Sequence, residues 1–211
     1  MRADLLELPD VGLLPRISRH QRPHCFDLVL PHVQKSGADR RQQPFVQTGA
    51  VVVHIKLIAP ATPEELDATR RIFEEYAAQL DVDLCFQNFD AELANLPGEY
   101  VAPEGMLLLV SVNQAMAGCC AMRPLHGVNY SNACEMKRLY VRPAFRRLGL
   151  GRQLAEAMVD AAHVAGYHHL LLDTLSDMES ARALYSDLGF EAIPPYYHNP
   201  IAGAHYLKLS L

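Results

Sequence analysis

The spacing of apolar and polar residues predicts alternating strands and helices over most of the chain. A β-branched run at residues 51–58 is typical of a strand. The helix that follows should begin at Pro63, because Thr62 and Glu65 have the types and spacing of a capping box and proline suits the first helical position. A second, short helix is expected at residues 90–96.

An uncharged run, residues 105–122, is about as long as a membrane span. Two polar residues in its middle, Asn113 and Gln114, interrupt it. The run therefore predicts a hairpin of two strands, 106–112 and 115–122, and not a transmembrane helix.

The pattern in the centre of the chain predicts a strand, a loop and a helix. Residues 134–141 favour a strand, and helical spacing of apolar residues begins at Gly149 and continues to about residue 165. The apolar run at 168–174 is typical of a buried parallel strand. These elements predict a βαβ unit with a right-handed crossover.

One more helix and two strands complete the pattern. Ser176 and Glu179 have the spacing of a second capping box, so the helix should start there. The last strands are expected at 190–193 and 205–209.

The first fifty residues differ from the rest of the chain. They contain five prolines and polar runs such as 37–43, with no sustained periodicity. We therefore expect residues 1–50 to be a poorly ordered N-terminal extension and residues 51–211 to form one domain.

The loop before the central helix is strongly basic. Its two glycines, Gly149 and Gly151, allow close approach to the main chain, and a helix N-terminus attracts anions. The pattern favours a phosphate-binding loop, although a merely solvated charged loop has the same composition. The basic residues of this segment are Lys137, Arg138, Arg142, Arg146, Arg147 and Arg152.

Two familiar phosphate motifs do not fit this loop. The dinucleotide fingerprint fails because Leu154 stands where its third glycine belongs, and a P-loop fails because Arg152 and Gln153 follow Gly151.

The segment from Arg146 to Gly151 resembles the [Q/R]-x-x-G-x-[G/A] motif of the GNAT superfamily, the acyl-CoA-dependent N-acyltransferases. Residues 181–190 resemble the A-x-x-L-Y-x-x-x-G-F segment of the same family, and both occur in the family's order. The resemblance covers about residues 51–211. It implies an α/β (mixed α+β) fold, with a mostly antiparallel sheet of about seven strands, a splayed parallel pair formed by the fourth and fifth, and about four helices.

The resemblance also implies a function. The chain should transfer an acetyl group from acetyl-CoA to a primary amine of a small molecule, by direct transfer in a ternary complex. Two alternatives stay open: an inactive acyl-CoA-binding regulatory module, and a protein N-acetyltransferase.

The same resemblance implies where acetyl-CoA binds. Main-chain N–H groups of the basic loop would hold the diphosphate, and the pantetheine would lie beside the strand that precedes the loop. The implied cofactor-binding residues are Leu139, Tyr140, Val141, Arg146, Arg147, Leu148, Gly149, Leu150, Gly151 and Arg152.

Two residues have the chemistry that proton transfer needs. Glu135 is the candidate general base, but taking a proton directly from an ammonium is uphill by about six pKa units, so it would act through water or with a pKa raised by burial. The alternative is a structural pair with Lys137 or a nearby arginine. Tyr185 is the candidate general acid for the leaving thiolate, and its alternative role is ring packing.

The chain departs from the family pattern at Met178, where many members carry an asparagine that hydrogen-bonds the cofactor. A thioether cannot replace those hydrogen bonds. By the same resemblance, the connection after residue 193 borders the acceptor pocket. The candidate substrate-binding residues are Tyr196, Tyr197, His198 and Asn199.

Composition narrows the function further. The 211 residues are enough for one core, and a formal net charge of −5 gives no reason to expect a nucleic-acid partner. The five cysteines include no C-x-x-C pair, which favours a reducing, cytoplasmic location, and no signal peptide is expected. The histidines lack metal-site spacing, so we expect no metal. We expect no membrane partner, and a homodimer is left open.

Overall fold

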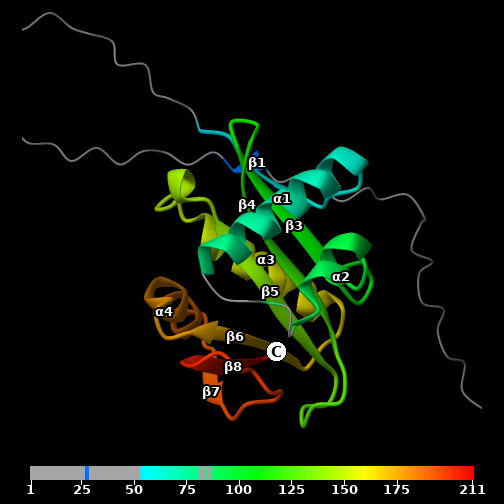
Figure 1. Ribbon diagram of the computed structural model, residues 1–211, viewed down its shortest axis with the longest axis vertical. Helices are drawn as coiled ribbons and strands as arrows, with labels where there is room; N and C mark the ends of the chain where they lie inside the picture. Colours follow the sequence, from blue (N-terminus) through cyan, green and yellow to red (C-terminus); the bar gives the residue numbers. More distant parts are fainter. Residues whose placement is uncertain (1–26, 29–52, 81–83, 85–86) are drawn as a thin grey trace, which may run out of the picture.

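The computed structural model describes residues 27–28, 53–80, 84 and 87–211. Within these ranges the chain forms one eight-stranded sheet and four α-helices (Figure 1). The strands are β1 (Asp27–Leu28), β2 (Ile55–Ile58), β3 (Met106–Val112), β4 (Ala115–Leu125), β5 (Ala133–Val141), β6 (His169–Leu175), β7 (Glu191–Ile193) and β8 (Ala204–Ser210). The helices are α1 (Pro63–Leu80), α2 (Phe89–Asn95), α3 (Leu150–Val164) and α4 (Glu179–Asp187), with a 3₁₀ turn, η2 (Pro143–Phe145).

The strand order is β1-β2-β3-β4-β5-β6-β8-β7, and β5 with β6 is the one parallel pair among these strands. The expected mixed α/β architecture is confirmed. Apart from the two-residue β1, the sheet has seven strands with a parallel pair in the middle, and there are four helices. The predicted hairpin is also confirmed, because the uncharged run forms β3 and β4. No helix in the described part of the chain is both long and apolar enough to cross a membrane.

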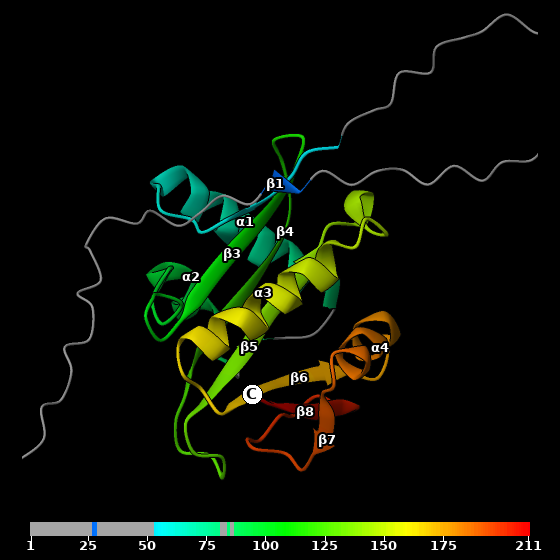
Figure 2. The same cartoon turned by 180° about the vertical axis from the view of Figure 1, so that it is seen from behind.

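Helices cover both faces of the sheet. Figure 1 shows α1 and α2 in front of the strands, and the view from behind in Figure 2 shows α3 on the other face. Successive residues of β3 point to opposite faces, as a strand requires. Thus Leu108 and Val110 belong to the core under α3, whereas Leu107 and Leu109 belong to the core under α1 and α2.

The start of α1 is the predicted capping box. The Thr62 hydroxyl accepts a hydrogen bond from the Glu65 N–H at 3.2 Å, and the Glu65 carboxylate accepts one from the Thr62 N–H at 3.1 Å. The helix begins at Pro63 as expected.

The capping box predicted for α4 is wrong. Its N-cap residue is Met178, which makes no side-chain capping hydrogen bond. The Ser176 hydroxyl instead bonds the Gly203 carbonyl at 3.2 Å and lies 2.9 Å from His205 Nε2. The hydroxyl is thus used to hold the segment before β8, a contact between distant parts of the sequence.

The parallel pair is joined along only part of its length. β5 pairs with β6 from Ala133 to Glu135, and beyond these residues the two strands separate. On its other side β5 carries a β-bulge, because Arg138 and Leu139 together lie opposite Cys120 of β4. Arg138 has a φ of 58°, a left-handed backbone that bends the strand at this point. The bulge and the separation together open the sheet at its centre.

Most of the expected N-terminal extension, residues 1–50, lies outside the described residues. Asp27 and Leu28 are described, and they pair antiparallel with Lys56 and Ile55 of β2. Of the strand predicted at 51–58, residues 55–58 form β2, and residues 51 and 52 lie outside the described part.

Candidate active site

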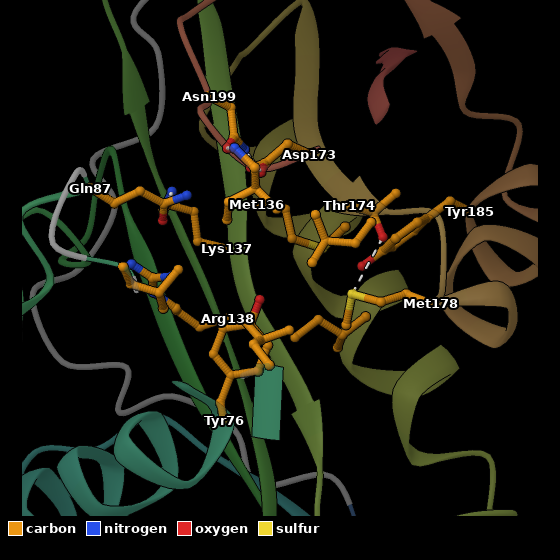
Figure 3. Close-up of a pocket in the computed structure, with 15 residues that line it drawn as sticks. Tyr76, Gln87, Met136, Lys137, Arg138, Asp173, Thr174, Met178, Tyr185 and Asn199 are labelled. Carbon is orange, nitrogen blue, oxygen red and sulfur yellow. Dashed lines mark hydrogen bonds between the residues drawn. The ribbon is translucent and has the colours of Figure 1, made fainter. Parts of the chain in front are cut away.

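A cavity occupies the space where β5 and β6 separate (Figure 3). Figure 3 shows Lys137 of β5 and Asp173 of β6 at one end, and Tyr185 with Met178 from the α4 segment at the other. Leu139, predicted as a cofactor contact, also lines the opening. We call this cavity the central gap.

The basic loop leads from β5 to an uncapped helix. Gly149 is the N-cap residue of α3 with a φ of 75°, and no side chain caps the helix there. The first turn contains no acidic residue. A Cβ added at Gly149 would meet nothing within 4 Å, and one at Gly151 would meet only Leu184 Cδ2 at 3.9 Å. The free main-chain N–H groups and the open space fit a phosphate group.

The arginines of the loop have different partners. Arg142 is held by both carboxylate oxygens of Glu75 at 2.7 Å, so it ties the loop to α1. Arg146 donates to Gln79 Oε1 at 3.0 Å, and Arg152 to Asp187 Oδ2 at 2.8 Å. Arg147 is exposed and makes no hydrogen bond within the described residues. Arg147 is therefore the loop arginine most available to an anion.

A second cavity, of about 440 Å³, lies beside the loop. Two predicted cofactor residues, Tyr140 and Arg146, line it together with the start of α4 at 178–181. Because it shares Tyr76, Leu80 and Met178 with the central gap, the two cavities adjoin. We call this second cavity the loop cavity.

Three other predicted cofactor residues occupy different surroundings. The side chain of Leu150 is buried in the core under α3, so only its main chain can face the loop. Leu148 is 40% exposed on the loop surface. The Val141 carbonyl accepts a hydrogen bond from Arg146 Nε at 3.1 Å. A role for these residues in binding a cofactor stays a prediction.

Glu135 is almost completely buried, with 2% of its surface exposed. Its carboxylate lies 3.0 Å from Arg123 and 3.7 Å from Lys137, and it accepts a hydrogen bond from the Tyr196 hydroxyl at 2.8 Å. Burial alone would raise the pKa of Glu135, but the charges of Lys137 and Arg123 outweigh it, so the pKa is lowered. The structural pairing considered for Glu135 is therefore present, and its role as a base stays a prediction.

Tyr185 reaches the central gap from α4 with 6% of its surface exposed. Its ring packs against Phe190 with ring centroids 5.6 Å apart, and its hydroxyl makes no hydrogen bond to any described residue. Burial raises the pKa of Tyr185 well above its ordinary value, so the phenol keeps its proton at neutral pH. The Tyr185 hydroxyl can therefore serve as a proton donor at this wall of the central gap.

Met178 lines both the central gap and the loop cavity. Its sulfur accepts a weak hydrogen bond from the Thr174 hydroxyl at 3.6 Å. The thioether thus fills the place where an asparagine would offer polar atoms, and it gives the wall an apolar surface.

A third cavity, of about 420 Å³, adjoins the central gap on the α2 side and shares Gln87 and Lys137 with it. Tyr196 and Tyr197 line this acceptor-side cavity, as does Glu135. The other two predicted substrate residues lie elsewhere. Asn199 lines the central gap, and the side chain of His198 is exposed.

Several residues of these cavities were not predicted as site residues from the sequence, among them Arg123, Gln87 and Asp173. Arg123 and Gln87 are far from the motifs along the chain, so only the fold brings them to Glu135 and Lys137. Asp173 had a visible signal, because it is the single charged residue in the apolar run at 168–174. No group of three or more histidine, cysteine or acidic residues that could hold a metal ion occurs in the described ranges.

The central gap connects a loop that suits an anion with a pocket that holds a carboxylate paired with cationic side chains, an arrangement that is compatible with acyl transfer. The comparisons name the family. The model of the acetyltransferase (GNAT) family matches residues 66–190. An uncharacterized N-acetyltransferase of Schizosaccharomyces pombe is 39% identical over 159 residues, covering 75% of this chain and 96% of the relative. An uncharacterized N-acetyltransferase of Dictyostelium discoideum is 28% identical and covers 70% and 95%.

Solved structures agree on the fold. An acetyltransferase from Streptococcus agalactiae has a TM-score of 0.61 at 18% identity, covering 74% of this chain and 98% of its own. YncA of Salmonella typhimurium, solved with its cofactor acetyl-CoA, has a TM-score of 0.53 at 20% identity and covers 74% and 93%. This chain belongs to the GNAT acetyltransferase family and is an acyltransferase.

Proposed function

We propose that the protein transfers an acetyl group from acetyl-CoA to a primary amine of a small molecule, directly and in a ternary complex. One observation carries the proposal: the loop cavity and the acceptor-side cavity both adjoin the central gap. A thioester held from the loop side and an amine held from the α2 side would meet where the strands separate. Direct transfer requires such a meeting point.

The loop side suits coenzyme A. The N-terminus of α3, with no side-chain cap and no acid in its first turn, would hold the diphosphate together with Arg147. At Leu139, β5 has already separated from β6, and β6 pairs with β5 only from Ala133 to Glu135 among the described residues. The main-chain groups on this edge of β5 would therefore be available to the cofactor. Acetyl-CoA supplies an acetyl group activated as a thioester. YncA, which shares the fold, is a structure with acetyl-CoA, and this likeness supports the assignment.

The walls of the gap suit the proton transfers. Tyr185 would donate its hydroxyl proton to the departing sulfur, because the phenol is protonated at neutral pH and faces the gap. Glu135, with its lowered pKa and its cationic partners, is poorly matched to an ammonium ion of pKa about 10.4. As a base it would act through water.

Two measurements on the purified protein test the proposal. Calorimetry should show binding of coenzyme A, and a library of amines incubated with acetyl-CoA should release free thiol for at least one acceptor. Binding without thiol release for any amine would favour the regulatory module. Acetylation of peptides but not of small amines would favour a protein N-acetyltransferase.

A variant of Tyr185 tests its role within the proposal. Tyr185→Phe keeps the ring packed on Phe190 and removes only the proton, so kcat should fall by about 100-fold or more while coenzyme A still binds. An unchanged kcat would remove the acid role from Tyr185.

A further inference from the structure

Two carboxylates lie close to the meeting point of the cavities, on neighbouring strands. Glu135 of β5 lines the acceptor-side cavity, and Asp173 of β6 lines the central gap itself. Register places Glu135 opposite Leu171, so Asp173 lies two residues further along β6, where the strands have separated. Asp173 is thus the carboxylate at the opening, as Figure 3 shows.

The two carboxylates have different partners. Glu135 is engaged by Arg123, Lys137 and the Tyr196 hydroxyl. The carboxylate of Asp173 accepts a hydrogen bond from the Asn199 amide at 3.3 Å and interacts with the Tyr197 hydroxyl, but it forms no ion pair within the described residues, and the side chain is half-buried. Asp173 therefore has carboxylate lone pairs left for a substrate, whereas those of Glu135 are largely occupied.

The surroundings shift the pKa values of Asp173 and Glu135 in opposite directions. Burial raises the pKa of Asp173 and the charge of Glu135 acts in the same direction, while Lys137 acts against it. The pKa of Glu135 is lowered. Such a divergence between neighbouring carboxylates is how enzymes separate a proton acceptor from a permanently charged group. The titratable and charged groups that face Asp173 are Glu135, Lys137 and Arg138 of β5, Tyr76 of α1, Tyr185 of α4, Tyr196 and Tyr197 of the β7–β8 connection, and Tyr206 of β8.

We propose that Asp173, and not Glu135, is the residue that takes the proton from the acceptor amine. The proposal rests on the proposed function. An N–H bond of the ammonium breaks, its electron pair stays on nitrogen, and the proton goes to an Asp173 carboxylate oxygen. The nitrogen pair then bonds to the acetyl carbon as the C–S bond breaks, and the sulfur takes the Tyr185 proton. The second proton lost by nitrogen restores Tyr185, and Asp173 releases its own to water.

Glu135 has a positioning role in this arrangement. It neutralises Arg123 and Lys137 and holds the Tyr196 hydroxyl, which fixes the wall of the acceptor-side cavity. Its loss should raise KM more than it changes the pH profile.

The pH dependence of Asp173→Asn tests the proposal. With wild-type protein, kcat/KM should be flat between the pKa of Asp173 and that of the amine, because the carboxylate accepts the proton. With Asp173→Asn, only amine already deprotonated by water reacts. For an amine of pKa about 10.4, the variant should therefore be about 1,000-fold slower near neutral pH, and its deficit should shrink about tenfold for each unit of rising pH. Glu135→Gln should keep the flat profile.

Two further measurements and one control variant accompany the pH profiles. Carboxyl carbon NMR of the free protein should show Asp173 titrating above the ordinary aspartate value of about 3.9, with the signal assigned by its loss in Asp173→Asn. Calorimetry should show that Asp173→Asn binds coenzyme A like wild type, which reports that it is folded. The exposed Asp160→Asn on α3 is the matched control, and it should change none of these quantities.

The outcomes separate this inference from the proposed function. If wild-type protein binds coenzyme A but acetylates no amine, the proposed function fails and the role of Asp173 fails with it, whatever its titration shows. If wild type is active and Asp173→Asn keeps the wild-type pH profile, or Glu135→Gln alone shows the tenfold slope, only the assignment to Asp173 is overturned.

Discussion

The N-termini of α1 and α3 differ in what surrounds their unpaired main-chain N–H groups. At α1, Thr62 and Glu65 satisfy main-chain N–H groups, and Glu64 and Glu65 place acids in the first turn. At α3, Gly149 provides no capping side chain, the first turn contains no acid, and arginines surround the turn. A helix that only has to begin satisfies its own N–H groups, whereas a helix that binds an anion leaves them for the ligand.

Among the changes at these two helix N-termini, making α3 resemble α1 should have the largest effect. Gly151→Glu would place an acid in the first turn of α3, where there is room for a side chain beside Leu184. Repulsion of the diphosphate should weaken coenzyme A binding by about 30-fold or more, corresponding to about 2 kcal/mol. Calorimetry measures this, and Gly151→Gln is the control of equal size. Equal losses in the two variants would show that bulk, not charge, causes the effect.

Removing the cap of α1 should affect stability but not binding. Thr62→Ala deletes the acceptor for the Glu65 N–H and should lower the free energy of unfolding by about 1 kcal/mol in urea titrations. Affinity for coenzyme A should stay at the wild-type value. A large loss of affinity would mean that the N-terminus of α1 also contributes to coenzyme A binding.

The smallest effect should separate two arginines of the loop. Arg147→Ala should weaken coenzyme A binding by a few-fold at low salt, because an exposed charge contributes about 0.2–1 kcal/mol, and the difference should disappear at high salt. Arg142→Ala should instead lower stability, because it removes the contact with Glu75 of α1. A salt-insensitive loss in Arg147→Ala would argue against a simple charge contact.

Local patterns in the sequence predicted what depends on neighbours along the chain. The capping box at Thr62, the β3–β4 hairpin and the strand-loop-helix around Gly149 all follow from spacing within a few residues. Ser176 shows the limit of this reasoning. The same residue types at the same spacing gave no cap, because β8 offered the Ser176 hydroxyl a competing partner across the sheet.

The chemistry of the site depended on distant contacts. The sequence predicted catalytic roles for Glu135 and Tyr185, but it did not predict the surroundings that shift their pKa values. Tyr196 reaches Glu135 across 61 residues, and Gln87 reaches Lys137 across 50. These contacts set the hydrogen bonds and charges around Glu135 and Lys137, and a linear pattern carries no information about them.

The bulge residue Arg138 connects β5 with α2. Its left-handed backbone shapes the opening of the sheet, while its buried guanidinium pairs with Glu92 of α2 at 2.6 Å and lies over the ring of Phe89. Breaking such a buried pair by removing one partner costs about 3–5 kcal/mol. Any redesign of α2 must therefore preserve Glu92, because losing this pair would destabilise the bulge that shapes the central gap.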